Sequence, residues 1–337
     1  MAKIEVYFLI LGSIFLDILI GDPKFLLHPV QVIGFSINKV SKFLLRYLNG
    51  KNSHILGGFL IFLIIVGFSY ISGKYLELQF YQSDKSFYYG IVILLGISSC
   101  LATKSLISSV KEIPKLIREK NIDEKAKEII IKKVQNLVSR EVDDSISDEA
   151  LLRYATESLT ENSVDGIFGP LFWILIGAFC IQHSIYLPGP LSLGFSYKAI
   201  STLDSMIGYK YIPFKNLGYF SAKIEDLVTF LPCRLVVLTL PLVCNKIGNY
   251  FSLVERAFND GSKYESPNSG LSESIFAFIA DIQLGGKNKY RNNIIFKPLL
   301  NKGGTNSDIN SIDKICKLIL RLQFLWITIF SLIFFLI

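Results

Sequence analysis

Long uncharged runs alternate with short polar segments along this chain. Three runs contain no Asp, Glu, Lys or Arg, namely Ile55 to Gly73, Ser86 to Thr103 and Gly166 to Tyr197. A membrane-spanning helix needs about 20 mostly apolar residues, so each run is long enough or nearly long enough to cross a bilayer. Three further runs carry one or two charges, namely Ile4 to Ile20, Leu227 to Cys244 and Leu318 to Ile337. The pattern predicts an all-α, multi-pass integral membrane protein with about five or six spans.

The polar stretch from Thr103 to about Arg140 has a different pattern. Apolar residues recur at helical spacing in two stripes, which contain Leu106, Val110, Ile113 and Ile117, and then Ile130, Val134, Leu137 and Val138. This spacing is typical of amphipathic helices that bury one face. We predict a helical hairpin at about 103–150, after the third span, within a single membrane-embedded domain over residues 1–337.

Basic residues give the expected orientation. Residues 39–51, after the first run, carry Lys39, Lys42, Arg46 and Lys51 without an acid, whereas bases and acids balance in 74–85. Cytoplasmic loops carry the excess of Lys and Arg, so residues 21–54 and the hairpin are expected in the cytoplasm of a cell-membrane protein.

Composition agrees with a lipid environment. Hydrophobic residues make up 51% of the 337 residues, and the mean hydropathy is +0.44. The formal charge of +7, without interleaved aromatic and basic residues, favours contact with membrane lipid and not with nucleic acid. The five cysteines are scattered without a Cys-x-x-Cys pair, which favours buried free thiols.

The third uncharged run raises a topological conflict. If Gly166 to Leu187 crosses the bilayer once, residues 188–226 lie on the other side from the remaining polar motifs. Pro170, Pro188, Gly189 and Pro190 favour a broken or re-entrant segment, which is tolerated where it lines an enclosed cavity. Alternatively, the polar residues near 204 lie at membrane depth, and the sequence leaves both readings open.

Three acids and an amide precede that run. On a helix, Glu157, Glu161 and Asp165 are spaced one turn apart and share a face, with Asn162 beside them. Like charges this close repel each other unless a cation bridges them, and carboxylates are ligands that Mg²⁺ favours. We expect these four residues to be catalytic and the three acids to bind a metal. An exposed helix end with acids near its N-terminus is the competing interpretation.

Four other clusters combine polar residues with Gly and Pro. The candidate substrate-binding residues in them are Asp22, His28, Asp204, Lys210, Asn268 and Ser269. A turn before Pro23, a packed histidine, a lysine reaching the membrane surface and an ordinary helix cap explain several of them equally well. The last cluster, Leu284-Gly-Gly, is short. Walker A, Gly-x-Gly-x-x-Gly, His-Glu-x-x-His and nucleophile-elbow signatures are absent from the sequence.

Taken in order, the clusters resemble those of the CbiB/CobD family of cobalamin biosynthesis proteins, the adenosylcobinamide-phosphate synthases. The matching segments are Asp17-Ile-Leu-Ile-Gly-Asp-Pro, His28-Pro-Val, Glu157-Ser-Leu-Thr-Glu-Asn-Ser-Val-Asp-Gly, Pro170-Leu-Phe-Trp, Thr202-Leu-Asp-Ser-Met-Ile-Gly-Tyr-Lys and Ser266-Pro-Asn-Ser-Gly. Residues 104–140 and those after Asn301 match no motif of the family.

The resemblance implies an enzyme that joins aminopropanol, or its phosphate, to a propionate side chain of adenosylcobyric acid. Amide formation from a free carboxylate is uphill in water, so ATP and Mg²⁺ are the expected cofactors and the corrinoid is the substrate. Two other classes compete, namely a non-catalytic membrane sensor like the AmpE-type proteins and a transporter. Association between copies of the chain stays open.

Overall fold

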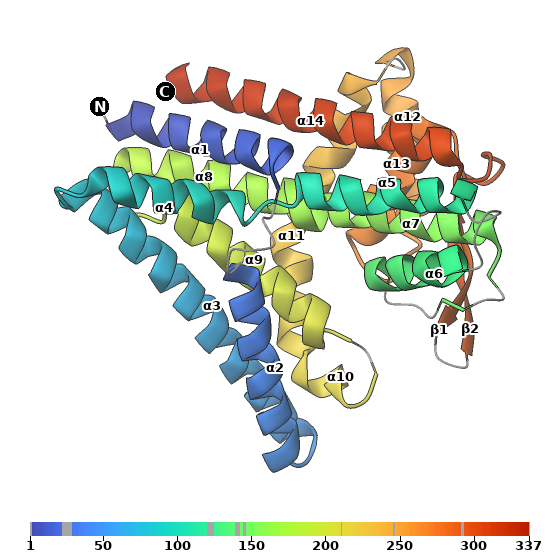
Figure 1. Cartoon of the computed structure of the whole chain (residues 1–337), viewed down its shortest axis with the longest axis horizontal. Coiled ribbons are helices and arrows are strands. Elements are labelled where there is room, and N and C mark those ends of the chain that lie inside the picture. Colours follow the sequence, from blue (N-terminus) through green and yellow to red (C-terminus); the bar gives the residue numbers. More distant parts are fainter. Residues whose placement is uncertain are drawn as a thin grey trace. The chain divides into compact units, whose positions relative to one another are not determined.

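Helices account for most of the computed structural model (Figure 1). The structure describes residues 2–21, 29–119, 125–138, 142–143, 146–209, 211–244, 247–290 and 293–336. Its helices are α1 (Ala2–Leu19), α2 (Pro29–Tyr47), α3 (Lys51–Gln82), α4 (Ser86–Ser98), α5 (Thr103–Glu119), α6 (Lys125–Leu137), α7 (Asp148–Ser163), α8 (Gly169–His183), α9 (Pro190–Ile207), α10 (Phe214–Leu217), α11 (Tyr219–Thr239), α12 (Tyr250–Gly261), α13 (Ser269–Ala280) and α14 (Ile309–Leu336). A π-helix, η1 (Val164–Phe168), joins α7 to α8, and short 3₁₀ turns, η2 (Leu240–Val243) and η3 (Ile247–Asn249), follow α11.

Five helical segments of the described chain are long and apolar enough to cross a membrane. They are Lys51–Gln82, Ser86–Arg118, Asp148–His183, Tyr219–Val243 and Ile309–Leu336. The prediction of an all-α, multi-pass fold is therefore confirmed. The first run is also helical as α1, but it is not among the five, because Lys3, Glu5 and Asp17 interrupt its apolar character.

Backbone contacts divide the chain into two compact units, each built from segments distant in sequence. Unit 1 contains 1–104, 165–229 and 333–337, and unit 2 contains 105–164 and 230–332. The single domain predicted for residues 1–337 stays a prediction.

Unit 1 is organised around α9, which packs on α2, α3 and α8. Its core contains Ile37, Ile61, Ile65, Leu203 and Ile207, all buried. The opposite side of α3 exposes large apolar side chains at every turn, as a lipid-facing helix does. At about 1.5 Å per residue, the 32 residues of α3 span about 48 Å, more than the hydrocarbon core of a bilayer.

The α8–α9 reversal agrees with the broken segment that was one of the two readings of the sequence. α8 ends at His183 and α9 begins at Pro190, so the intervening residues turn the chain back on itself. Close approaches occur between Gly177 and Gly189 near the turn and between Gly169 and Tyr197 farther from it, which makes the two helices antiparallel. The chain is therefore broken after His183, and the C-terminal end of α9 returns to the level of the start of α8.

Glu77 of α3 fixes this reversal. Its buried carboxylate accepts hydrogen bonds from the backbone amides of Leu191 at 2.7 Å and Ser192 at 3.1 Å, and from the Ser192 hydroxyl at 3.0 Å. These amides belong to the first turn of α9, where orphan N–H groups and the helix dipole favour a negative charge. Lys74, one turn earlier on α3, donates to the carbonyl groups of Ile185 and Leu187 in the turn.

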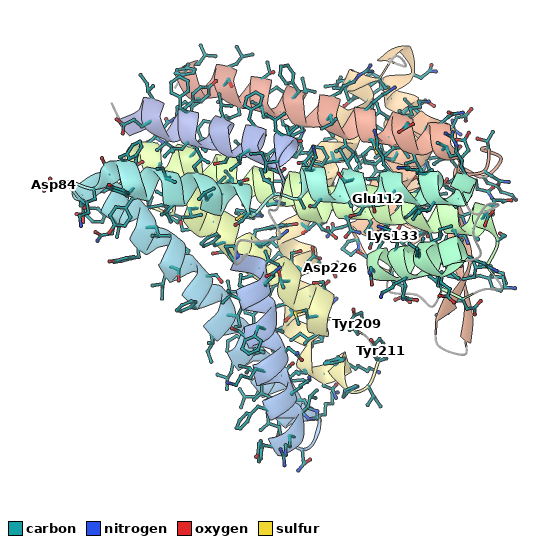
Figure 2. All side chains as sticks on the ribbon, in the orientation of Figure 1. Asp84, Glu112, Lys133, Tyr209, Tyr211 and Asp226 are labelled. Carbon is teal, nitrogen blue, oxygen red and sulfur yellow. The ribbon has the colours of Figure 1, made fainter. Side chains whose placement is uncertain are left out.

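Unit 2 surrounds α13, whose residues from Gly270 to Ala280 are all buried. α12, α7 and a β-hairpin pack against it. The hairpin pairs β1 (Leu284–Tyr290) antiparallel with β2 (Asn293–Leu300), and the sequence analysis did not predict it. The predicted helices after Thr103 are α5 and α6, and an ion pair between Glu112 and Lys133 joins them (Figure 2).

Candidate functional site

The motif acid Glu157 lies in unit 2 as part of a buried ion pair. Its side chain is 0% exposed, and Arg153 Nη1, one turn earlier on α7, lies 3.1 Å from Glu157 Oε1. The same carboxylate oxygen accepts a hydrogen bond from the Gly285 backbone amide at 2.9 Å. A buried carboxylate is costly unless it is paired and hydrogen-bonded, and these contacts meet both conditions.

Gly285 and Gly286 form a bulge that makes this contact possible. Their φ angles are +85° and +89°, and the strand register shifts between Leu284 and Gly286. A Cβ at Gly285 would lie 2.1 Å from the Pro298 carbonyl oxygen, so only glycine fits. The bulge presents the Gly285 amide to Glu157 and its carbonyl to Arg153. The short Leu284-Gly-Gly motif thus holds α7 against the hairpin.

A second buried acid, Glu273, lies nearby on α13. It is 0% exposed, with Lys297 Nζ at 3.6 Å from one oxygen and the Tyr264 hydroxyl donating to the other at 3.4 Å. A Cβ at Gly285 would also lie 3.2 Å from the Tyr264 hydroxyl. Glu157 and Glu273 therefore belong to one polar cluster, the α7–hairpin cluster, which comprises Arg153, Glu157, Tyr264, Glu273, Gly285 and Lys297.

The Ser266–Gly270 motif caps α13. Ser266 Oγ accepts hydrogen bonds from the amides of Asn268 and Ser269, both at 3.3 Å. Asn268 Oδ1 accepts one from Arg234 Nη1 at 3.0 Å, and the Arg234 guanidinium also stacks on Phe230 at 3.3 Å. The predicted substrate contact of Asn268 is thus occupied by Arg234 in this structure, whereas Ser269 is half-buried.

Glu161 and Asn162 occupy the end of α7, and both are half-buried. Asn162 Nδ2 donates to Ser158 Oγ at 2.8 Å, and that hydroxyl donates to the Leu137 carbonyl of α6 at 2.7 Å. The Glu161 carboxylate, in contrast, makes no hydrogen bond or ion pair with any residue that the structure describes. It is an acid at a partly closed position whose oxygens are available to a ligand.

In unit 1, Asp17 lies beside residues that approach the start of η1. Asp17 is 1% exposed, and its Oδ2 accepts a hydrogen bond from the Thr103 amide at 3.1 Å. A Cβ at Gly166 would lie 3.4 Å from that of Ala102, next to Thr103. Asp17 and Asp165 therefore belong to the same end of this unit.

The motif that begins at Thr202 reaches the end of unit 1 that contains Asp17 and Asp165, because α9 runs back along α8. Gly169 lies one turn after Asp165 and contacts Tyr197, which lies about two turns before Asp204 on the antiparallel helix. The Tyr197 hydroxyl also lies 3.0 Å from Thr229 Oγ1, which donates to Glu225 at 2.6 Å. Asp17, Asp165 and Asp204 therefore lie toward the same end of this unit, which we call the acidic end of unit 1.

Tyr209 borders the acidic end of unit 1. Its ring stacks on Tyr211, with centroids 5.0 Å apart (Figure 2). Burial, with further contributions from Tyr211 and Asp204, raises the pKa of the Tyr209 phenol above its ordinary value. The phenol stays protonated at neutral pH and is able to donate a hydrogen bond.

The expected metal site is not found in the described residues. No group of three or more His, Cys, Asp or Glu side chains there is placed to hold an ion, including Glu157, Glu161 and Asp165. One cause is visible, because the Glu157 carboxylate is turned to Arg153 and the Gly285 amide. Asp22, His28 and Lys210 lie outside the described residues.

The sequence interpretation missed Arg153 and Lys297, which pair with buried acids, and Glu77, a buried acid that caps α9. Arg153 had a detectable signal, because an Arg and a Glu four residues apart face each other on a helix. Glu77 and Lys297 contact residues of other elements, and no local pattern marks such pairs.

Comparisons with known proteins agree with the motifs. The CobD/Cbib protein family model matches residues 10–319. The cobalamin biosynthesis protein CobD of Synechocystis is 39% identical over 87% of this chain and 81% of its own length. CobD of Leptospira interrogans is 32% identical over 96% of both chains, and CbiB of Salmonella typhi is 30% identical over 90% of this chain and 89% of its own. No solved structure matches the chain. With a family model covering most of its length and relatives this similar, the chain belongs to the CobD/CbiB family.

Proposed function

We propose that this protein acts in cobalamin biosynthesis as a cell-membrane amide ligase. It would join aminopropanol, or its phosphate, to a propionate side chain of adenosylcobyric acid with ATP. Its relatives over nearly full length are named cobalamin biosynthesis proteins, which supports the pathway. Five apolar helices in the described chain support a membrane location.

The proposed reaction balances as two displacements. A propionate oxygen bonds to the γ-phosphorus of ATP as the β–γ bridging bond breaks, and ADP leaves. The amine nitrogen then bonds to the acyl carbon while the C–O bond to phosphate breaks, and a base takes the proton from nitrogen. The products are the amide, ADP and phosphate.

Glu161 carries the proposal. It belongs to the motif shared with the family, it is half-buried, and its carboxylate has no partner among the described residues. A carboxylate in this position is suited to accept the proton of the attacking amine. Asn162, held by Ser158, is placed next to it to bind a polar substrate group. We assign this role to Glu161 and not to Glu157, because Arg153 and the Gly285 amide contact the Glu157 carboxylate.

No group of three or more acids among the described residues is placed to hold an ion, and Mg²⁺ enters this proposal as the counterion of ATP.

The test is amide formation by the purified protein with ATP, Mg²⁺, adenosylcobyric acid and either amine, read by mass spectrometry. Glu161→Gln should lower turnover by at least about a hundredfold, the range of a lost general base. Glu149→Gln removes an exposed acid from the first turn of the same helix and should leave turnover unchanged. Normal turnover by Glu161→Gln would remove this residue from the mechanism.

The two competing classes predict other results. A membrane sensor would consume no ATP with these substrates, and a transporter would move a corrinoid across proteoliposomes without forming an amide. The antiparallel α8–α9 pair shows the broken helix that a transporter would use, but the sequence lacks the internal repeat typical of transporters.

A further inference from the structure

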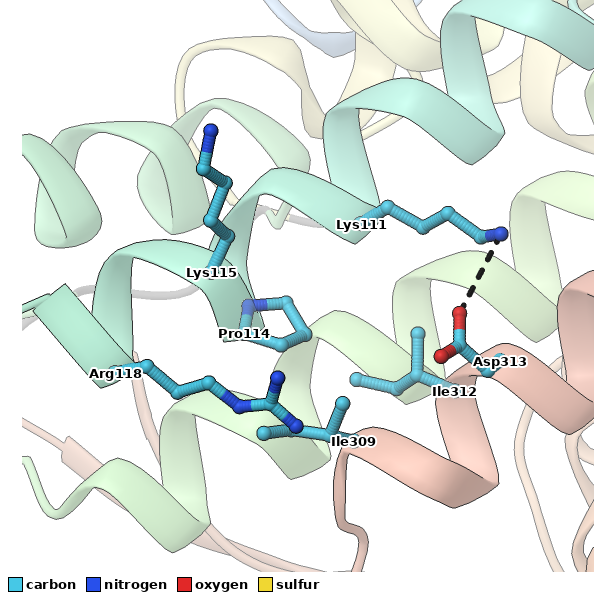
Figure 3. Close-up of a pocket in the computed structure, with 7 residues that line it drawn as sticks. All are labelled: Lys111, Pro114, Lys115, Arg118, Ile309, Ile312 and Asp313. Atoms are coloured by element: carbon cyan, nitrogen blue, oxygen red, sulfur yellow. Dashed lines mark ion pairs between the residues drawn. The ribbon is translucent and has the colours of Figure 1, made fainter.

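A groove between α5 and α14 of unit 2 lies in a part of the chain that no family motif covers. Its lining residues are Lys111, Pro114, Lys115, Arg118, Ile309, Ile312 and Asp313 (Figure 3). The three bases come from one face of α5, since they are four and three residues apart. We propose that this groove binds a phosphate group, carried by a small phosphorylated substrate or by a lipid headgroup.

The charge of the groove favours an anion. Three bases against one acid give a net charge of two positive, and a phosphomonoester carries nearly two negative charges at neutral pH. Lys111 Nζ lies 3.4 Å from Asp313 Oδ1, while Lys115 and Arg118 have no acidic partner among the described residues. Like charges so placed repel each other, and a bound phosphate removes that repulsion.

The shape favours a small ligand. The cavity volume is about 390 Å³, near the lower end of the range for ligand sites of about 300–1,000 Å³. Pro114, Ile309 and Ile312 form an apolar floor, and Arg118 extends along Ile309 at one end while Lys111 reaches Asp313 at the other (Figure 3). A guanidinium beside an apolar floor is suited to a phosphate joined to a short carbon chain or a nucleoside, and a corrinoid is too large.

Asp313 competes with the ligand for Lys111 in this arrangement. It holds Lys111 by an ion pair, and both side chains are about half exposed, so the pair opens at little cost. An entering phosphate repels Asp313 and takes Lys111 from it. Removing the acid charge should therefore strengthen binding, which loss of folding cannot imitate.

The test measures binding without turnover. The full chain is placed in nanodiscs of zwitterionic lipid and titrated calorimetrically with inorganic phosphate, aminopropanol phosphate and ATP. At least one of them should bind, Arg118→Ala should weaken it about tenfold, and Asp313→Asn should strengthen it severalfold. Lys302→Ala removes an exposed base elsewhere in unit 2 and should change nothing.

A second arm identifies the source of the phosphate. Nanodiscs with added phosphatidylglycerol report whether this lipid is enriched around the protein and whether Arg118→Ala abolishes the enrichment. Arg118-dependent binding of either source supports the groove. The proposed groove is overturned if binding is absent in both arms, or if binding is unchanged in Arg118→Ala and Asp313→Asn.

The choice of phosphorylated substrates as probes rests on the proposed function. The phosphate-binding groove and the ligase activity are nevertheless rejected by different results. Amide formation without Arg118-dependent phosphate binding would reject the groove alone. Arg118-dependent binding without amide formation would reject the ligase and leave the groove.

Discussion

Neutralising Glu157 should damage stability, because the structure makes this motif acid part of the fold. In Glu157→Gln, the amide oxygen is able to keep the hydrogen bond from Gly285, but the charge that faces Arg153 is lost. Hydrogen bonds to charged groups contribute about 1.5–3 kcal/mol, and removing one partner of a buried pair costs about 3–5 kcal/mol. Since Arg153 keeps its hydrogen bonds to the carbonyl oxygens of Gly285 and Lys287, we expect the free energy of unfolding to fall by about 2–3 kcal/mol.

The assay is thermal unfolding in nanodiscs, followed by a thiol-reactive dye that reads the buried cysteines. A cooperative unit of about 150–250 residues loses about 2–4 °C in Tm for each kcal/mol of lost stability, so Glu157→Gln should melt about 4–12 °C lower. Arg153→Met combined with Glu157→Gln should cost less than the sum of the single changes, because the double variant leaves no unpaired buried charge. An unchanged Tm with complete loss of turnover would refute this reasoning and return Glu157 to the site.

Three other changes test particular contacts. Gly285→Ala should unfold unit 2 more easily by at least about 1–3 kcal/mol, measured by denaturant titration, since its Cβ meets Pro298 at 2.1 Å and φ is +85°. Glu77→Ala should make the turn after His183 sensitive to protease, because the first amides of α9 lose their acceptor. Tyr209 should titrate above pH 10 by ultraviolet absorbance, and its contribution to stability should fall as pH rises beyond 10, because the folded state then holds more protons than the unfolded state.

The membrane character of the fold was predictable because it depends on composition along the chain. A helix in lipid must satisfy its backbone internally, so an uncharged run of sufficient length has few alternatives. The long runs around Ile55, Ser86 and Gly166 accordingly became helices. The reversal at Pro190 was only one of two readings, since Glu77, the residue that caps α9, lies 114 residues away from Leu191.

The candidate site was less predictable, because its residues are fixed by partners far along the chain. The spacing of Glu157, Glu161 and Asp165 indicated one shared face, but it could not show that Arg153 and the Gly285 amide contact the Glu157 carboxylate. The β-hairpin was missed because Gly285, Gly286 and Lys287 weaken the strand pattern before the β-branched Ile294 and Ile295.

The pairing of Arg153 with Glu157 affects the order in which the contacts of Glu157 form while the polypeptide chain is synthesised. The Gly285 amide that completes the environment of Glu157 is synthesised 128 residues later, after several helices have left the ribosome. Arg153 and Glu157, in contrast, are one turn apart and able to pair as soon as α7 forms. The Glu157 carboxylate therefore has a counterion within its own helix before the hairpin that completes its surroundings has been synthesised.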